Sequence, residues 1–238
     1  MKVDLSARAP ELVELMDDPD ADLAMLERTY DRFRLVNAAV ARPGLLLRRD
    51  ILPRARRGPV RILDVGAGGG DVSRMIARRL RRDGLAAEVT ALDADERAVR
   101  WAKANDGGAG VRYRRALAAD LVAEEERYDV VFSNHVLHHL ADAERQEVLE
   151  DTRRLVNPGG VVVHRDIARS TAAYALFDLG TALLSRSFLR GSFIRVDGLL
   201  SIRRSYTPRE LRAVAPPGWT VRGALPARLE LRWEEPAG

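Results

Sequence analysis

Short runs of apolar residues alternate with helix-like patterns along the chain. The run over 60–65 is apolar and rich in β-branched residues, as a strand buried on both faces requires. A cluster of glycines ends this run, and apolar positions spaced by three and four residues then predict a helix over 72–80. The alternation continues with strands predicted at 88–93, 111–114, 128–134 and 161–167. It predicts an α/β fold with a mostly parallel sheet and helices on both faces.

The residues before the first strand have a helical pattern of their own. A short helix is predicted at 10–16, and apolar residues recur every three or four positions over 23–40. After a Pro-Gly break, a further helix is predicted over 45–51. We interpret 1–57 as an amphipathic helical cap, because an amphipathic helix packs its apolar face against another surface. A purely structural cap and a dimer element explain the pattern equally well.

A helical insertion is predicted between the fifth and sixth strands, over 168–204. Aromatic residues are more frequent in its helix, at 174–188, than in the rest of the chain, and a loop is predicted over 191–198. The insertion could form part of a pocket or a dimer surface. A membrane-touching patch is a weaker alternative that its interspersed arginines allow.

Two helix boundaries and a final strand pair complete the pattern. Asp142 is predicted to cap a helix over 143–156, which the N-P-G-G turn at 157–160 ends. Thr207 begins a capping box that opens the last helix. The alternating segments 219–224 and 228–233, joined through 225–227, predict an antiparallel pair. The domain over 58–238 is therefore expected to be Rossmann-like, with seven strands.

Composition narrows the class of protein. At 238 residues the chain suits one α/β domain with additions. The absence of cysteine excludes disulfides, thiolate metal sites and cysteine nucleophiles. No apolar run reaches the ~18 residues of a membrane span, and the N-terminus lacks a secretory signal, so we expect a cytoplasmic protein. The charge of +4 comes from arginines mixed with 35 acidic residues, which disfavours a nucleic-acid partner.

The spacing of the glycine cluster is informative about its ligand. A dinucleotide fingerprint would need glycine where this chain has Asp71. The chain instead has the pattern D-x-G-x-G-x-G, formed by Asp64, Gly66, Gly68 and Gly70. This pattern resembles motif I of class I S-adenosylmethionine-dependent methyltransferases. The resemblance implies that the glycines shape the cofactor turn and that Asp64 orients this turn or the cofactor's ammonium group. A tight strand–helix turn without a ligand is the alternative interpretation.

The resemblance implies further contacts for S-adenosylmethionine and its product, S-adenosylhomocysteine. Asp93 ends the second strand, where an acid hydrogen-bonds ribose hydroxyls in Rossmann-like folds, and Ala94 follows it. The position that usually carries an acid against the adenine falls on Leu117, and Asp120 comes three residues late. Asn134, at the end of the fourth strand, is expected near the methionine moiety.

Three of the four histidines follow the fourth strand. His135 with His138 or His139 has a spacing that places two imidazoles on one helical face, but no H-E-x-x-H pattern or cysteine completes a set of ligands, so we predict no metal site. The N-x-V-L-H-H-L run resembles the segment that borders the methyl-transfer site in ubiquinone/menaquinone-type and natural-product methyltransferases. Since imidazole is a suitable base for a phenol or hydroxyl, we predict His139 as the catalytic base, with His138 as a competitor. Histidines that merely pack a helix start are the alternative.

The end of the fifth strand adds a candidate acid. Alternation places His164 and Asp166 on one side of the strand, and ligands of open α/β sheets gather beyond the carboxyl ends of strands. We therefore expect both side chains to meet substrate, and Asp166 to compete as catalytic residue or to orient a histidine from the neighbouring strand. A buried salt bridge from Asp166 to Arg165 or Arg169 is the alternative.

The resemblance covers about 58–235 and implies an enzyme. We predict methyl transfer from S-adenosylmethionine to an oxygen, or an aromatic carbon, of a small phenolic, quinone-like or polyketide acceptor. By the same resemblance, 1–57 and 168–204 would form a lid over this acceptor. A homodimer is also compatible with the sequence.

Three other functions are alternatives to this prediction. An RNA methyltransferase is disfavoured because the N/D-P-P-Y/F run of base amino methylation is absent. A non-catalytic partner protein with this fold is a further alternative. A nicotinamide-dependent oxidoreductase is disfavoured by Asp71.

Overall fold

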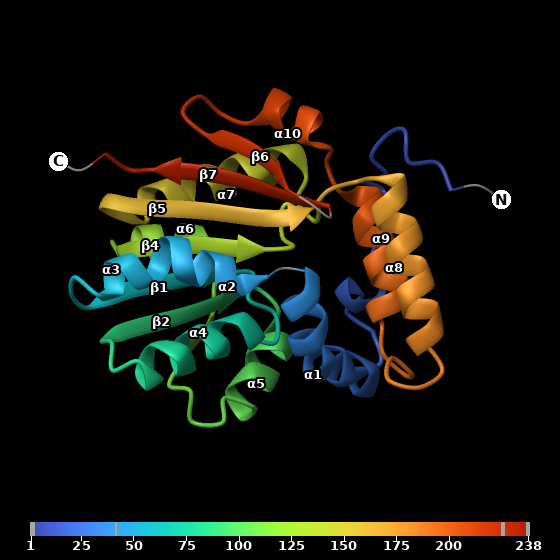
Figure 1. Cartoon of the computed structure of the whole chain (residues 1–238), viewed down its shortest axis with the longest axis horizontal. Helices are drawn as coiled ribbons and strands as arrows, with labels where there is room; N and C mark the ends of the chain where they lie inside the picture. Colours follow the sequence, from blue (N-terminus) through green and yellow to red (C-terminus); the bar gives the residue numbers. More distant parts are fainter. Residues whose placement is uncertain (1–2, 41, 225–226, 237–238) are drawn as a thin grey trace.

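A seven-stranded sheet lies at the centre of the computed structural model, which describes residues 3–40, 42–224 and 227–236 (Figure 1). The strand order is β3-β2-β1-β4-β5-β7-β6; the first five pair in parallel, and β7 is antiparallel to both its neighbours. The predicted mostly parallel, seven-stranded sheet is confirmed. The strands are β1 (Val60–Val65), β2 (Ala87–Asp93), β3 (Arg112–Arg115), β4 (Tyr128–Asn134), β5 (Val156–Ile167), β6 (Thr220–Ala224) and β7 (Arg228–Glu234).

Helices cover both faces of this sheet, as the sequence predicts. One face packs against α2 (Pro43–Leu46), the π-helical η2 (Leu47–Ile51), α3 (Leu52–Ala55), α4 (Asp71–Arg82) and α5 (Glu96–Ala104). The other face packs against α6 (Ala118–Ala123), α7 (Asp142–Arg154) and α10 (Pro208–Val214). Among the described residues, no helix is both long and apolar enough to cross a membrane.

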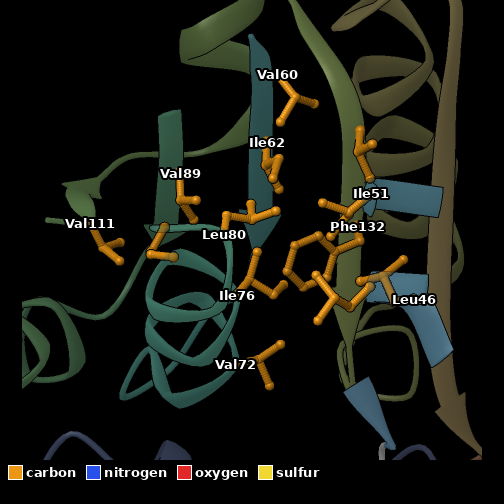
Figure 2. Packing of buried hydrophobic residues seen from close by; sticks show 14 of the residues in the cluster. Leu46, Ile51, Val60, Ile62, Val72, Ile76, Leu80, Val89, Val111 and Phe132 are labelled. Atoms are coloured by element: carbon orange, nitrogen blue, oxygen red, sulfur yellow. The ribbon is translucent and has the colours of Figure 1, made fainter. Parts of the chain in front are cut away.

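The two-residue period of β1 explains how this interior strand packs on both faces of the sheet. Ile62 belongs to the apolar cluster on the α4 face, and Leu63 and Val65 belong to the cluster on the opposite face. Figure 2 shows the first cluster, in which side chains of β1, α4 and the N-terminal helices interdigitate. Ile62 and Leu63 are fully buried, which stabilises the fold by about 1.5–3 kcal/mol for each side chain.

The remaining helices gather beyond the carboxyl ends of β4 and β5, where α8 and α9 form an adjacent pair (Figure 1). These elements are η1 (Leu15–Asp17), α1 (Leu23–Val40), α8 (Thr171–Leu184) and α9 (Ile194–Arg204). The carboxylate of Asp197 in α9 accepts hydrogen bonds from the backbone N–H groups of Leu15 (2.8 Å) and Met16 (3.0 Å). The N-terminal cap and the insertion are therefore joined to each other above the sheet.

Two predictions in these added segments are wrong. The helix predicted at 10–16 is only a 3₁₀ turn at its end, because its backbone N–H groups bond to Asp197 instead of continuing a helix. The loop predicted at 191–198 ends early, since α9 begins at Ile194. Helix α9 packs on α8, and this tertiary contact is not visible in local sequence.

Two predicted boundaries near β5 are also corrected. Asp142 is the first residue of α7 rather than its cap; Ala141 is the cap residue, and its N–H donates to the Glu144 carboxylate at 2.7 Å. The N-P-G-G segment is not a free turn but a bulged part of β5. Tyr128 pairs with Val156, and Val130 pairs with Val161. The chain therefore advances by five residues in β5 where it advances by two in β4, which makes a bulge.

Other local signals agree with the structure. The capping box at Thr207 is present, with Glu210 N–H donating to Thr207 Oγ1 at 3.2 Å. The last two strands pair as predicted, although positions 225 and 226 of their connection lie outside the described residues. The short helix α6 has no counterpart among the predicted elements; Asp120 caps it by accepting from Leu117 N–H at 2.8 Å.

The bulge in β5 depends on the absence of a side chain at Gly160. A Cβ at this position would lie 2.8 Å from Asn157 O and 2.9 Å from Asp129 O, and these backbone atoms of the paired strands cannot move aside freely. We expect Gly160→Ala to lower the free energy of unfolding by about 1–3 kcal/mol, measured by urea denaturation. Gly58→Ala is the control, because no described atom lies within 4 Å of a Cβ there. Equal losses in the two variants would contradict this explanation.

Candidate functional site

A cavity of about 680 Å³ lies at the carboxyl ends of β1, β2 and β4. The strand ends contribute Gly68, Asp93 and Asn134 to its wall. The N-terminal cap contributes Glu14 and Tyr30, and the insertion contributes Phe177, Ile194 and Asp197. Parallel strands bring their carboxyl ends to one edge of a sheet, so residues far apart in sequence converge there.

The glycine turn forms one side of this cavity. Gly66 has φ +68, and a Cβ there would lie 2.5 Å from Val136 Cγ2, so the turn requires glycine for packing. Gly68 has φ +53, and no described atom lies within 4 Å of a Cβ built on it. Its backbone N–H donates to Asp93 Oδ2 at 2.7 Å. The structure therefore leaves open space over Gly68 and holds the turn against the end of β2.

Asp64 and Gly70, two predicted cofactor residues, lie outside the cavity wall that the described residues form. Asp64 is buried and its Oδ2 accepts from Ser73 Oγ at 2.6 Å, which ties β1 to α4. A Cβ on Gly70 would lie 2.8 Å from the Tyr113 ring. Both residues thus support the turn from behind instead of reaching its ligand side.

The cavity beside the glycine turn is rich in carboxylates. Burial raises the pKa of Asp64 to about 8, and burial also raises the pKa values of Asp71 and Asp93. Asp71 lines the cavity and accepts from Asn37 Nδ2 at 3.2 Å. Each raised value means that the environment disfavours one more negative charge. A nearby cation would oppose this effect, because an opposite charge favours the ionised form of a carboxylate.

The remaining predicted cofactor residues all line the cavity. They are Asp93, Ala94, Leu117 and Asn134. Leu117 is 60% exposed, which is unusual for a large apolar side chain and leaves it available to a ligand. The amide Oδ1 and Nδ2 of Asn134 are both buried, and neither has a hydrogen-bond partner in the described part of the chain. Since such groups are costly to leave unpaired, Asn134 is suited to a polar ligand.

The predicted pairing of a histidine with a strand-end carboxylate is present between His138 and Asp166. His138 Nδ1 lies 2.7 Å from Asp166 Oδ1, and the His138 backbone N–H donates to Asp166 Oδ2 at 3.0 Å. Burial alone would lower the pKa of His138, but the charge of Asp166 and the contacts with Asp166 and Glu14 raise it to about 9. Burial opposes a charge on Asp166, yet the His138 charge holds the pKa of Asp166 well below its usual range. The pair is therefore a buried ion pair at neutral pH.

His135 and His139 are more accessible than His138. Each has a side chain that is 27% exposed, and both line the cavity. His139 Nδ1 lies 3.0 Å from Asp17 Oδ2 in the N-terminal cap. The sequence patterns did not single out Asp17 or Glu14, which are brought to these histidines only by the folded cap.

His164 does not meet the cavity, contrary to the prediction. It is fully buried, with Nδ1 2.8 Å from Ser133 Oγ and Nε2 3.1 Å from Thr152 Oγ1. Burial lowers its pKa to about 4. His164 is thus a neutral core residue. Nor is Asp166 paired with an arginine: Arg165 pairs with Glu230 and Arg169 with Glu210.

Comparison with known proteins agrees with this architecture. A family model described as "Methyltransferase domain" matches residues 62–160. The ubiquinone biosynthesis O-methyltransferase of Cereibacter sphaeroides is 34% identical over 152 residues, which are 61% of this chain and 58% of that protein. The corresponding protein of Mesorhizobium japonicum is 32% identical over 169 residues, with 69% and 65% covered. The chain thus spans less than two thirds of the length of these relatives.

Solved structures share the fold at low sequence identity. The plantazolicin methyltransferase BpumL, in complex with a triazolic desmethylPZN analog and SAH, has a TM-score of 0.61 at 14% identity, with 93% of both chains covered. A structure solved for the conversion of a disulfide bond into a thioacetal group during echinomycin biosynthesis has a TM-score of 0.53 at 22% identity, with 78% of this chain and 79% of that chain covered. Residues 62–160 thus match a methyltransferase domain, in agreement with the predicted resemblance, and the chain shares the fold of solved methyltransferases at low sequence identity.

The raised pKa of Asp64 has a consequence for stability. Below pH 4 the Asp64 carboxyl is protonated in both the folded and the unfolded protein. As the pH rises towards 8, the unfolded chain loses this proton while the folded protein keeps it. This group therefore lowers the free energy of unfolding across that window. We expect Asp64→Asn to remove this effect. Between pH 5 and pH 8, the free energy of unfolding of the variant should therefore rise relative to that of the wild type by more than about 1.4 kcal/mol. Urea denaturation at both pH values measures the gain, and a difference that does not change with pH would contradict the assignment.

Proposed function

We propose that this protein transfers the methyl group of S-adenosylmethionine to an oxygen, or an aromatic carbon, of a small phenolic, quinone-like or polyketide acceptor. One observation carries the proposal. The open glycine turn at Gly68, the Asp93 carboxylate and the unpartnered amide of Asn134 converge on one cavity. The names of the curated relatives, which are O-methyltransferases, favour oxygen as the acceptor atom.

The donor set fits S-adenosylmethionine. The cofactor supplies an activated methyl group on a sulfonium, so the protein chiefly binds and orients the two reactants. Asp93 retains lone pairs for ribose hydroxyls beyond the two N–H groups that it accepts, from Gly68 and Asp95. Asn134 offers a donor and an acceptor to the amino-acid end. Asp71 and its neighbours favour the positive charges of the ammonium and sulfonium.

The acceptor side of the cavity is formed by the cap and the insertion. Met16, Phe33, Phe177 and Ile194 line it with apolar surface. Its volume lies in the usual range of small-molecule sites, about 300–1,000 Å³. We infer that 1–57 and 168–204 act as a substrate lid and that the acceptor is a small molecule rather than a nucleic acid. A cytoplasmic location and a homodimer stay predictions from the sequence.

Among the three predicted catalytic residues, His139 fits the role of base best. It lines the cavity, and Asp17 holds its Nδ1, which leaves Nε2, 3.8 Å from Glu14 Oε1, as the nitrogen that can take a proton. His138 is buried between Asp166 and Glu14 and already carries a proton at neutral pH. We therefore propose that His138 and Asp166 position the segment, while His139 receives the proton of the acceptor.

Calorimetric titration tests the cofactor assignment directly. We expect micromolar binding of S-adenosylmethionine and S-adenosylhomocysteine and no binding of NADH. Asp93→Ala removes a charged hydrogen-bond acceptor and should weaken binding at least tenfold. Asp120→Asn is the control, because Asp120 caps α6 and does not line the cavity. Unchanged affinity in Asp93→Ala, with the fold intact by circular dichroism, would overturn this site.

Turnover tests the acceptor side separately. With a phenolic or quinol acceptor found by screening for transfer of labelled methyl, His139→Asn should lower kcat by about 10²-fold or more, because a positioned base is lost. The affinity for S-adenosylmethionine should stay the same. A variant with full kcat would show that His139 does not take the proton.

A further inference from the structure

Three side chains from distant parts of the chain meet at one point of the cavity wall. Glu14 Oε1 lies 3.2 Å from His138 Nε2 and 3.8 Å from His139 Nε2. One potential ligand atom of each residue lies within 4.8 Å of the others. Glu14 and His138 are almost fully buried, and His139 is half-buried.

The two imidazole rings are oriented from behind by carboxylates. Asp166 holds Nδ1 of His138 at 2.7 Å, and Asp17 holds Nδ1 of His139 at 3.0 Å. Both Nε2 atoms are thereby left on the side of Glu14. A carboxylate on the far nitrogen is the arrangement that orients metal-ligating histidines and raises their basicity.

The buried Nε2 of His138 supplies an independent observation. The residue is 1% exposed, and in the described part of the chain Nε2 has no aligned hydrogen-bond partner, although it is close to Glu14. An imidazole nitrogen that is buried and aimed at a carboxylate, without a hydrogen bond to it, is an unsatisfied group. A cation between the two, bound by His138 in place of its Nε2 proton, would satisfy both groups.

We propose that Glu14, His138 and His139 bind a divalent transition-metal cation such as Zn²⁺. Two imidazoles and one carboxylate are a common ligand set for zinc, with metal–ligand bonds of roughly 2.0–2.2 Å. Tetrahedral bonds of that length place neighbouring ligand atoms about 3.4 Å apart, and the two distances to Glu14 Oε1 lie on either side of this value. Small side-chain shifts would complete the geometry. The donor set disfavours Mg²⁺ and Ca²⁺, which prefer oxygen ligands.

This site differs from the sequence prediction of no metal, which followed from the absence of an H-E-x-x-H pattern and of cysteines around the histidines. The third ligand comes from the cap, so no local pattern contains the set. The site does not depend on methyl transfer. It does bear on the proton step, because His139 Nε2 cannot hold a cation and accept a proton at once; cation binding would take that role away from His139.

Direct metal binding tests the proposal without any activity assay. The purified protein is freed of metal with a chelator, the chelator is removed, and Zn²⁺ is titrated by calorimetry. Titration with Co²⁺ reports the ligand geometry through its visible absorption. We expect one equivalent to bind in both titrations. Glu14→Gln and His139→Asn should each weaken binding at least tenfold, and Asp17→Asn about tenfold through the loss of its support for His139.

Glu147→Gln is the matched control, because Glu147 is a carboxylate on the same cavity wall outside the cluster. It should bind as the wild type does. Circular dichroism and S-adenosylmethionine titration show whether each variant is folded, so a failure here is distinct from a failure of the proposed function. Absence of stoichiometric binding in the wild type, or wild-type affinity in both Glu14→Gln and His139→Asn, would overturn the site and leave an ion-pair network.

Discussion

The shape of the proposed cofactor site depends on the two hydrogen bonds that the Asp93 carboxylate accepts. One oxygen accepts the N–H of Gly68 and the other accepts the N–H of Asp95, so a single side chain at the end of β2 fixes the glycine turn after β1 and the start of α5. The turn can lie open towards a ligand because glycine adopts its positive φ values without strain. The shape of the cavity floor thus follows from two adjacent parallel strands that end at the same edge.

The acceptor side depends on a different set of contacts, which join the cap to the sheet. His138 lies between Asp166 of β5 and Glu14 of the N-terminal segment, and Ser201 of α9 donates to the same Glu14 at 2.9 Å. Arg204 donates to the carbonyls of His138 and His139. The additions to the Rossmann-like core are therefore held by buried polar pairs. Such pairs are costly when one partner is missing, so the cap and the site are coupled energetically.

Local signals identified the elements better than the roles of polar residues. Asp142 is a residue type that often caps helices, but it is the first residue of α7; Ala141 holds the cap position and Glu144 accepts its N–H. His164 shares a strand face with Asp166, yet it bonds to Ser133 and Thr152 in the core because α7 covers that part of β5. The role predicted for each residue was wrong: the cap position of α7 lies one residue earlier, and His164 has its partners in β4 and α7 rather than in the cavity.

The sequence by itself determined the strand–glycine–helix unit, the seven strands, and the positions of Asp93 and Asn134 at strand ends. These follow from periodicity and from turn chemistry, which act over a few neighbouring residues. Only the tertiary structure decided that Asp64 and Gly70 lie behind the turn, that His138 is a buried cation, and that Glu14 and Asp17 face the histidines. Asp17 and His139 are 122 residues apart, and their contact exists because the cap folds over the sheet edge. Contacts between distant elements produce no periodic pattern in the sequence. The contacts of Glu14 and Asp17 with the histidines therefore could not be predicted from the sequence.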